Sequence, residues 1–481
     1  MAVRRLAFAS GGLFLAAVVT SAGVTTASAA SAAAPEPRLD PAVNYGSPGG
    51  NKVKAPSKPT SSKKKKRYYV AQGPRFNWPT GNTSQQGAID LYVKKLIRNT
   101  PKGAEIDVSL FRLQTDGMAK ELVAAHKRGV KVRLVLDSNT RSSRVHVYDY
   151  LKRNLGTSTK NRSWVLLCPR GRGCIAPAVK GQWSKNHNKF YAFSHTYDSR
   201  NVVVQTSGNA TGGMYNQYND SYTSTDARIY TAYRTYFYDL AKRKVNANYW
   251  RTYNAGFRKT SFFPKATGDP ILDVLDKVSC TGGKTWINVT MGLMARQHIA
   301  RKLSALDDQG CHVKMVAGSF GGTAAQDLTR PGRNKGPEVR YFTGAQKQHA
   351  HSKYLLIDGL YYGKRHRLVL TGSHSYTWDA LRWNDEAMIT IDHAWTYGRY
   401  LSNFNLVFAA AKGRLSMSPL IAPPIVPDNA QESDREAAAP SKEAELPPTE
   451  GTTGTPPAED VRPPANGSPD PIVTEEPAPG A

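Results

Sequence analysis

One order of elements occurs twice in this chain, and the repetition constrains its fold more than any other feature of the sequence. Each copy is a strand, an amphipathic helix, a glycine that ends the helix, and a second strand. The first copy comprises residues 106–111, 118–128, Gly129 and 130–136. The second comprises residues 286–291, a helix marked by Ile299, Leu303 and Leu306, Gly310 and residues 311–316. A strand–helix–strand unit of this length is a parallel crossover, so two of them predict a duplicated α/β fold.

A segment rich in aromatic residues separates the two copies. It runs from Ile229 to about Ala255, and Tyr233, Tyr236 and Phe237 recur in it at helical spacing. An apolar stripe of this kind is typical of a helix that faces a core, which is a commoner use of such rings than the stacking of nucleic-acid bases. We therefore predict a core-facing helix between the two halves.

Each crossover is followed by the same short motifs in the same order. In the first half, a His-x-Lys motif at residues 187–189 is followed by Ser207, 20 residues after its histidine. In the second half, a His-x-Lys motif at residues 351–353 is followed by Ser373, 22 residues after its histidine. A single His-x-Lys is a weak signal, but agreement in order and spacing indicates that the two motifs act as a pair.

The paired residue types suit the chemistry of a phosphodiester. On an extended strand, His and Lys two positions apart lie on the same face. Imidazole is a nucleophile or proton carrier near neutral pH, and ammonium neutralises a phosphate oxygen. Two such motifs facing each other across a pseudo-twofold axis place an imidazole on each side of one phosphorus. One imidazole can then attack while the other protonates the leaving alcohol.

The motifs resemble those of the phospholipase D superfamily. The likeness rests on the two His-x-Lys motifs, the small polar strands at residues 206–209 and 371–375, and the Asn-Asp-Glu element at residues 384–386. It covers nearly all of residues 67–415. It implies a duplicated phospholipase D-like α/β fold whose pseudo-twofold-related halves have mixed sheets flanked by helices, with the active site at their interface. It also implies a two-step reaction through a phosphohistidine, without metal or cofactor.

The resemblance carries roles onto matching positions. It makes His187 the nucleophile and His351 the general acid, which later acts as base toward water. It assigns Asp358 to the catalytic residues and places it, with Glu386, among the carboxylates that orient an imidazole. It assigns the binding of the phosphate to Lys189, Lys353, Ser207, Asn209 and Ser373.

The chain departs from the family pattern at two positions. Ser194 stands where the first motif of the family has Asp, and Ser375 stands where the second half usually has Asn. Asp358 therefore has no symmetric partner. This leaves open which of the two histidines is the nucleophile.

The ends of the chain differ in composition from its centre. Arg4 and Arg5 precede an apolar stretch and a small-x-small cleavage site at residues 27–29, which predicts secretion. The predicted division of the chain is a signal peptide at 1–30, a basic disordered linker at 31–66, a first half at 67–255, a second half at 256–421 and a disordered acidic, Pro-rich tail at 422–481.

Four cysteines fit an oxidising compartment. Cys168 and Cys174 enclose a short loop, Cys280 precedes one apolar strand and Cys311 opens another. Pairing in local order gives Cys168–Cys174 and Cys280–Cys311 among three possible connectivities. A zinc site is the competing interpretation, and it is disfavoured because only one of the two intervals is short.

Charge narrows the class of substrate without identifying it. The chain has a net charge of +28, and its last 54 residues, from Asp428 onward, carry −9, so the remainder carries +37. Such a surface attracts nucleic acid or an anionic membrane.

We predict a secreted enzyme that hydrolyses phospholipid head-group phosphodiesters and contacts membranes peripherally. The alternatives are a secreted non-specific nuclease on the same scaffold and a non-catalytic envelope protein that binds phosphate. One chain holds both halves, so a monomer is sufficient.

Overall fold

The computed structural model describes residues 67–143, 145–330, 336–417 and 422–426. The predicted signal peptide and linker, and nearly all of the predicted tail, lie outside these residues. Two residues of the predicted tail form strand β22, Ile425–Val426, which pairs with β14. None of the helices in the described part of the chain is long and apolar enough to cross a membrane.

The first half contains a mixed sheet of seven strands, in the order β1-β9-β7-β6-β2-β3-β4. Strands β2, β3 and β4 are parallel, and the other neighbours are antiparallel. The bounds are β1 Gly73–Phe76, β2 Glu105–Leu110, β3 Lys131–Leu136, β4 Trp164–Leu167, β6 Lys189–Thr196, β7 Ser199–Thr206 and β9 Asp220–Ser224.

The second half contains a larger mixed sheet, in the order β10-β11-β20-β18-β17-β13-β14-β15-β21, with β12 paired to β17. Six consecutive strands, from β20 to β15, match the run from β9 to β4 in the first sheet. The bounds are β10 Arg251–Ala255, β11 Arg258–Phe262, β12 Val278–Ser279, β13 Trp286–Met294, β14 His312–Gly321, β15 Glu338–Tyr341, β17 Tyr354–Tyr361, β18 Lys364–Gly372, β20 Ala387–Asp392 and β21 Gly413–Arg414.

Both predicted crossovers are confirmed. Helix α3, Asp116–Lys127, connects the parallel strands β2 and β3, and helix α8, Gln297–Asp308, connects the parallel strands β13 and β14. Gly129 and Gly310 follow these helices with φ of 92° and 96°, a region that glycine enters without steric cost. The duplicated α/β fold inferred from the sequence is therefore the fold of the chain.

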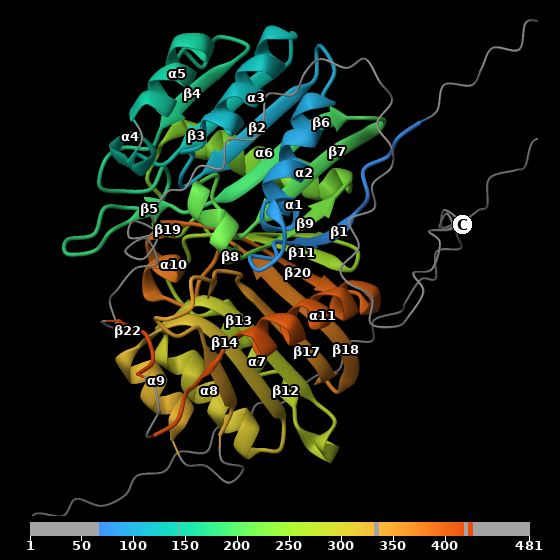
Figure 1. Ribbon diagram of the computed structural model, residues 1–481, viewed down its shortest axis with the longest axis vertical. Coiled ribbons are helices and arrows are strands. Elements are labelled where there is room, and N and C mark those ends of the chain that lie inside the picture. The colour runs from blue at the N-terminus through green and yellow to red at the C-terminus, as the bar shows by residue number, and fades with distance from the viewer. Residues whose placement is uncertain (1–66, 144, 331–335, 418–421, 427–481) are drawn as a thin grey trace, which may run out of the picture. The chain divides into compact units, whose positions relative to one another are not determined.

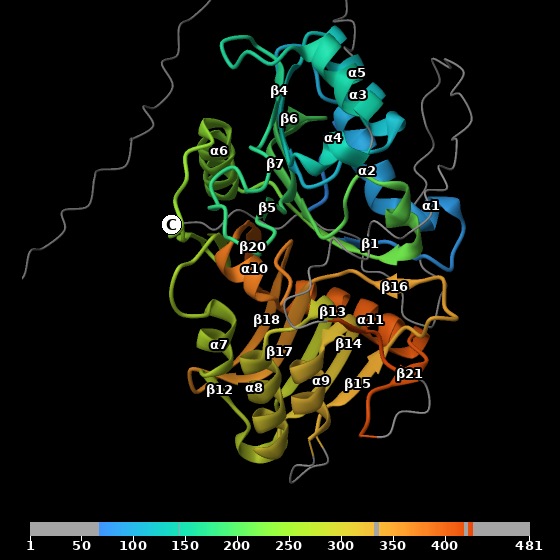
Figure 2. The same cartoon turned by 90° about the vertical axis from the view of Figure 1, so that its left-hand side faces the viewer.

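Helices cover both sheets (Figures 1 and 2). On the outer face of the first sheet, α2 (Ala88–Arg98), α3 and α5 (Val145–Leu155) enclose one core cluster. On the outer face of the second sheet, α7 (Pro270–Leu275), α8 and α9 (Gly322–Thr329) enclose another. The shorter helices are α1 Thr83–Gln86, α4 Asn139–Ser143 and α10 Trp378–Arg382, with a 3-10 turn at Gly212–Asn216.

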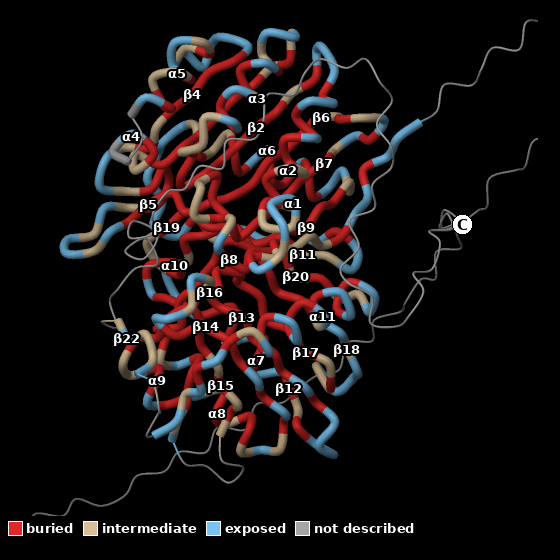
Figure 3. Tube along the Cα trace, viewed as in Figure 1, coloured by how far each residue is buried: buried red, intermediate tan, exposed pale blue. Residues whose placement is uncertain are grey.

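The two sheets share a third core cluster, which contains side chains of α6 (Ala227–Lys242) and α11 (Ala394–Ala410). Alternate residues of several strands, among them β6, β7, β17 and β18, reach opposite clusters. On β6, for example, Phe190 lies in the shared cluster and Tyr191 in the outer one. Buried residues therefore continue from one half into the other, as the red parts of the chain trace show (Figure 3).

The aromatic segment between the halves is only partly helical. Helix α6 is core-facing as predicted, with Tyr233, Tyr236 and Phe237 buried. It ends at Lys242, and residues 251–255, which the prediction included in the helix, form the edge strand β10. Arg243 follows the helix in a left-handed conformation with φ of 53°, and its N–H bonds the Leu240 carbonyl to close the last turn.

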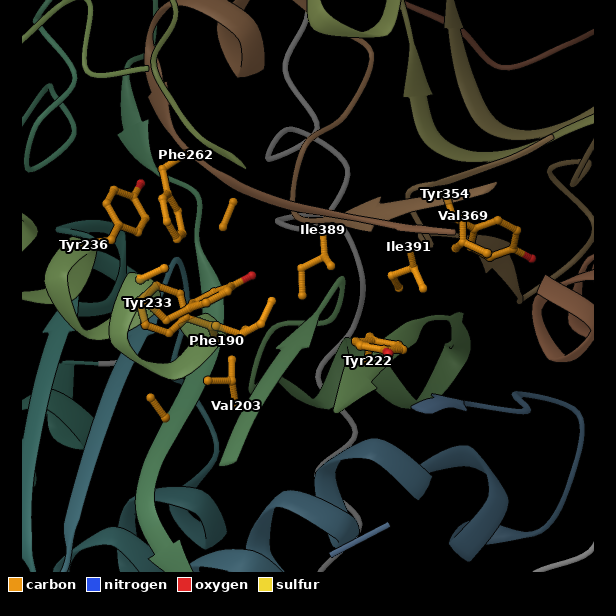
Figure 4. Close-up of a cluster of buried hydrophobic side chains, with 14 of the residues drawn as sticks. Phe190, Val203, Tyr222, Tyr233, Tyr236, Phe262, Tyr354, Val369, Ile389 and Ile391 are labelled. Atoms are coloured by element: carbon orange, nitrogen blue, oxygen red, sulfur yellow. The ribbon is translucent and has the colours of Figure 1, made fainter. Parts of the chain in front are cut away.

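The shared cluster is rich in aromatic contacts (Figure 4). Phe262 of β11 stacks on Tyr236 of α6 at a centroid distance of 4.4 Å and meets the edge of Tyr233 at 5.1 Å. The first half is thereby packed directly against the second.

We expect Phe262→Ala to lower the free energy of unfolding by about 3–5 kcal/mol, because the fully buried ring would leave a cavity. Urea unfolding measures this change. Leu406→Ala, at a side chain that is 46% exposed, is the control and should change stability by about 0.5 kcal/mol or less. Two separate transitions in the wild-type protein would contradict a core shared by the halves.

Candidate active site

Two short parallel ladders join the halves where the His-x-Lys motifs begin. Strand β5 (Lys185–Asn186) pairs with β19 (Asn384–Asp385), and β16 (His349–Ala350) pairs with β8 (Gln217–Tyr218). Figure 2 shows β5 and β16 near the junction of the two sheets. In each ladder the strand before one half's histidine is bonded to the other half.

The backbone continues this exchange at the histidines themselves. The His187 N–H donates to the Asp385 carbonyl, and the His351 N–H donates to the Tyr218 carbonyl, both at 3.0 Å. Neither motif lies on one continuous strand as predicted: His187 lies in the link between β5 and β6, which Lys189 opens, and residues 351–353 link β16 to β17. The lysine Nζ folds back to donate to the histidine carbonyl, at 3.0 Å in the first half and 2.7 Å in the second.

The predicted histidines and lysines are all buried in the site, each with 2% exposure or less: His187, Lys189, His351 and Lys353. Burying ionisable groups is costly unless partners compensate them. The imidazole partners are therefore the central feature of this site.

The partner of His187 is Glu386, a residue of the other half. His187 Nδ1 lies 2.8 Å from Glu386 Oε1, and the Ser373 hydroxyl donates to Glu386 Oε2. A carboxylate accepts hydrogen bonds, so it fixes the proton of the neutral imidazole on Nδ1. The predicted role of Glu386 as an orienting carboxylate agrees with this geometry.

The partner of His351 is Asn219, again from the opposite half. His351 Nδ1 lies 2.7 Å from Asn219 Oδ1, which also accepts the Ser207 hydroxyl at 3.0 Å. The two arrangements use the same kinds of residue in the same places, but the serine and histidine bond separate oxygens of the Glu386 carboxylate and share the single amide oxygen of Asn219. The site is therefore symmetric in shape and asymmetric in charge.

The surroundings keep His187 neutral. Burial is the largest cause, followed by the positive charges of Lys189, Lys185 and Lys353, and together they lower the pKa of His187 well below 6.5. A neutral imidazole is the form that can act as a nucleophile.

Lys185 is a further cation in the site. It is 1% exposed and pairs with Asp379 at 3.3 Å. The amide of Asn384 donates to Asp379 at 3.1 Å and to Glu386 at 3.4 Å, so the network reaches the partner of His187. The Phe111 ring lies against both lysines and His187. Its centroid is 5.3 Å from Lys189 Nζ, 5.7 Å from Lys185 Nζ and 5.1 Å from the centroid of the His187 ring.

Asp358 does not orient an imidazole, so this prediction is wrong. It lies on β17 and pairs with Arg365 at 2.7 Å and Arg367 at 3.2 Å. It lies seven positions after His351, about 23 Å along extended chain at the rise of a strand. Ser194, which stands in the corresponding place of the first half, accepts the Glu105 N–H at 2.9 Å on β6. The loss of Asp at that position therefore leaves the histidines untouched.

The other predicted residues also lie near the motifs. Ser207 and Ser373 follow the ends of β7 and β18, and both bond the histidine partners, as described above. Asn209 is buried just beyond Ser207. In the described residues, no group of three or more His, Cys, Asp or Glu side chains is arranged to hold a metal.

Sequence reasoning missed the roles of Asn219 and Lys185. The spacing held a usable signal, because Asn219 comes 12 residues after Ser207 and Glu386 comes 13 residues after Ser373. Aligning the halves on their serines brings Asn219 to within one position of Glu386. The sequence around each motif does not show that its histidine bonds a side chain of the opposite half.

The predicted cysteine pairs lie at disulfide distance. Cys168 and Cys174 are bonded, as are Cys280 and Cys311, with S–S distances of 2.09 and 2.03 Å.

The family model described as "Cardiolipin synthase, PLD-like domain" matches residues 93–240 and 281–407. These two ranges make up more than half of the chain, and each contains one His-x-Lys motif. The protein therefore belongs to the PLD-like domain family of the phospholipase D superfamily, whose members are phosphoryl-transfer enzymes. No curated protein matches the chain.

The solved structures that match this chain are distant in sequence. Polyphosphate kinase from Porphyromonas gingivalis is 11% identical over 70% of this chain and 50% of its own, with a TM-score of 0.48. This chain thus spans half the length of that kinase. Phosphatidylserine synthase from Haemophilus influenzae is 13% identical over 71% and 87%, with a TM-score of 0.48. Nuc from Salmonella typhimurium, a phospholipase D family member, is 15% identical over 36% and 96%, with a TM-score of 0.25.

We expect the pKa of the His187 ring to lie well below 6.5, because burial and nearby lysines oppose its protonation. Proton–nitrogen correlation spectra of protein labelled in the histidine rings report the protonation state across a pH titration. His187→Asn identifies the signals by their disappearance. A midpoint at or above 6.5 would contradict the described electrostatics.

Proposed function

We propose that this protein is a secreted phosphodiesterase of the phospholipase D type, which hydrolyses phospholipid head-group phosphodiesters through a phosphohistidine. The observation that carries the proposal is the pair of buried His-x-Lys motifs, each with its imidazole bonded to a side chain of the other half. Secretion is supported by the predicted signal peptide and by two disulfides, which persist in oxidising compartments.

The asymmetry of the partners supports one assignment of the two roles. A phosphorylated imidazole carries a positive charge, and the Glu386 carboxylate stabilises that charge, so His187 is the nucleophile. The acid must release and regain a proton in each cycle. The neutral amide of Asn219 orients His351 without fixing it in its charged form.

The reaction has two balanced steps. Nε2 of His187 attacks phosphorus, because Nδ1 is bonded to Glu386, and the bond from phosphorus to the head-group oxygen breaks. Protonated His351 gives its proton to the leaving alcohol. Water then attacks the phosphohistidine, His351 takes the proton from that water, and the P–N bond breaks. Lys189 and Lys353 neutralise the phosphate oxygens throughout.

A substrate with a very good leaving group separates the two roles. With bis(p-nitrophenyl) phosphate, which needs little help from an acid, His351→Ala should keep most of its first-step rate. With an alkyl head group, the same variant should lose about 10²–10⁴-fold. His187→Ala should be inactive on both substrates. Pre-steady-state release of nitrophenol measures the first step, and the opposite pattern would exchange the roles.

A secreted nuclease is the second candidate, and the +37 charge of the chain before the acidic tail favours it. Phosphatidylcholine vesicles and plasmid DNA are incubated in parallel with wild-type protein and with His187→Asn. We expect choline release by the wild type alone. DNA cleavage without lipid turnover would reject the lipid substrate, and activity on neither would reject both candidates.

A further inference from the structure

A turn of the first half binds one carboxylate of the second half through three consecutive backbone N–H groups. Asp385 Oδ2 accepts from Cys174 N at 2.6 Å, and Oδ1 accepts from Ala176 N at 2.7 Å. Ile175 N lies between the two oxygens, at 3.2 and 3.3 Å. Successive N–H groups that converge in this way form a concave anion site.

The turn is shaped closely around the carboxylate. A Cβ on Gly173 would lie 2.7 Å from Asp385 Oδ2, so only glycine permits this approach. The Ser184 hydroxyl accepts the Gly173 N–H at 3.1 Å and donates to the Trp383 carbonyl at 2.5 Å. The turn is therefore bonded both to Asp385 and to the backbone two residues before it.

Covalent and polar links fix the conformation of the turn. Cys174, the first donor, is bonded to Cys168 and closes a seven-residue loop. The Arg172 guanidinium donates to the carbonyls of Gly173, Cys174 and Arg243, each at 3.0 Å. The Arg172 side chain thus helps to hold the turn in its conformation. A bridge across a short loop removes alternative conformations in which the N–H groups point apart.

Asp385 is joined to the proposed nucleophile in two ways. Its carbonyl accepts the His187 N–H, and the next residue is Glu386, which bonds the His187 ring. In the other half Tyr218 takes the place of Asp385, and its ring stacks on Phe342 at 5.3 Å. The position equivalent to Asp385 on the His351 side therefore holds an aromatic ring and not a carboxylate.

Asp385 depends on this turn for its charge. It is fully buried, and burial raises its pKa to about 7 although the three N–H groups act in the opposite direction. Without those donors the buried carboxylate would be poorly compensated. Either the chain around it would rearrange or the carboxylate would take up a proton.

We propose that Asp385 is a positioning residue for the His187–Glu386 pair, and that the turn closed by the Cys168–Cys174 bridge holds it in place. This inference rests on the proposed function. It assigns the first disulfide to catalysis and leaves the second, Cys280–Cys311, to the stability of the second half.

Paired disulfide variants test the proposal. In C168S/C174S, kcat should fall by about 10- to 100-fold, because a displacement of about 1 Å at a reacting group has effects of this size. KM and inhibition by inorganic phosphate should stay within about twofold, since Lys189 and Lys353 are untouched. The matched variant C280S/C311S should keep the wild-type kcat.

Two single substitutions keep the test decisive if the cysteine variant does not fold. Asp385→Asn replaces one of the two acceptor oxygens by an amide donor that faces the N–H groups of the turn, and Gly173→Ala forces the turn and the carboxylate apart. Both should lower kcat without raising KM. Gly398→Ala, where a Cβ meets nothing within 4 Å, is the control for the glycine change.

The outcomes separate this inference from the proposed function. Wild-type kcat in folded Asp385→Asn and Gly173→Ala would overturn the positioning role. Equal losses in both cysteine pairs, with KM raised alongside, would show a purely structural effect and overturn it too. An inactive wild-type protein would instead reject the proposed function.

Discussion

The exchange of histidine partners between the halves is the interaction on which the site depends. His187 is oriented by Glu386 across 199 residues of sequence, and His351 is oriented by Asn219 across 132. Neither half contains a complete site. The shared aromatic core and the two short ladders hold the halves in the one register in which both hydrogen bonds form. The duplicated fold thus makes stability and catalysis depend on the same interface.

The duplication preserves geometry while the two copies have diverged in charge. Serine after each long strand, the partner side chain and the backbone bond to each histidine recur in both halves. One copy has Glu386 with an anchored Asp385 before it, and the other has Asn219 preceded by Tyr218. A two-step displacement uses its two imidazoles differently, so unequal partners suit the reaction better than equal ones would.

Local patterns were sufficient to predict much of this structure. The crossovers follow from apolar periodicity and a terminal glycine, and Cys168–Cys174 follows from local order. The place of Asp358 was predicted wrongly because a family motif gives the order of residues along the chain and not the distance between Asp358 and the His351 ring. The turn around Asp385 could not be foreseen, because its hydrogen bonds join residues 209 to 211 positions apart and depend on how the halves pack.

The central claim is that the histidine supported by a carboxylate forms the covalent intermediate. Rapid acid-free quenching during turnover, followed by digestion and tandem mass spectrometry, identifies the residue that carries the phosphoryl adduct. The account predicts the adduct on His187. An adduct on His351 and none on His187 would contradict it.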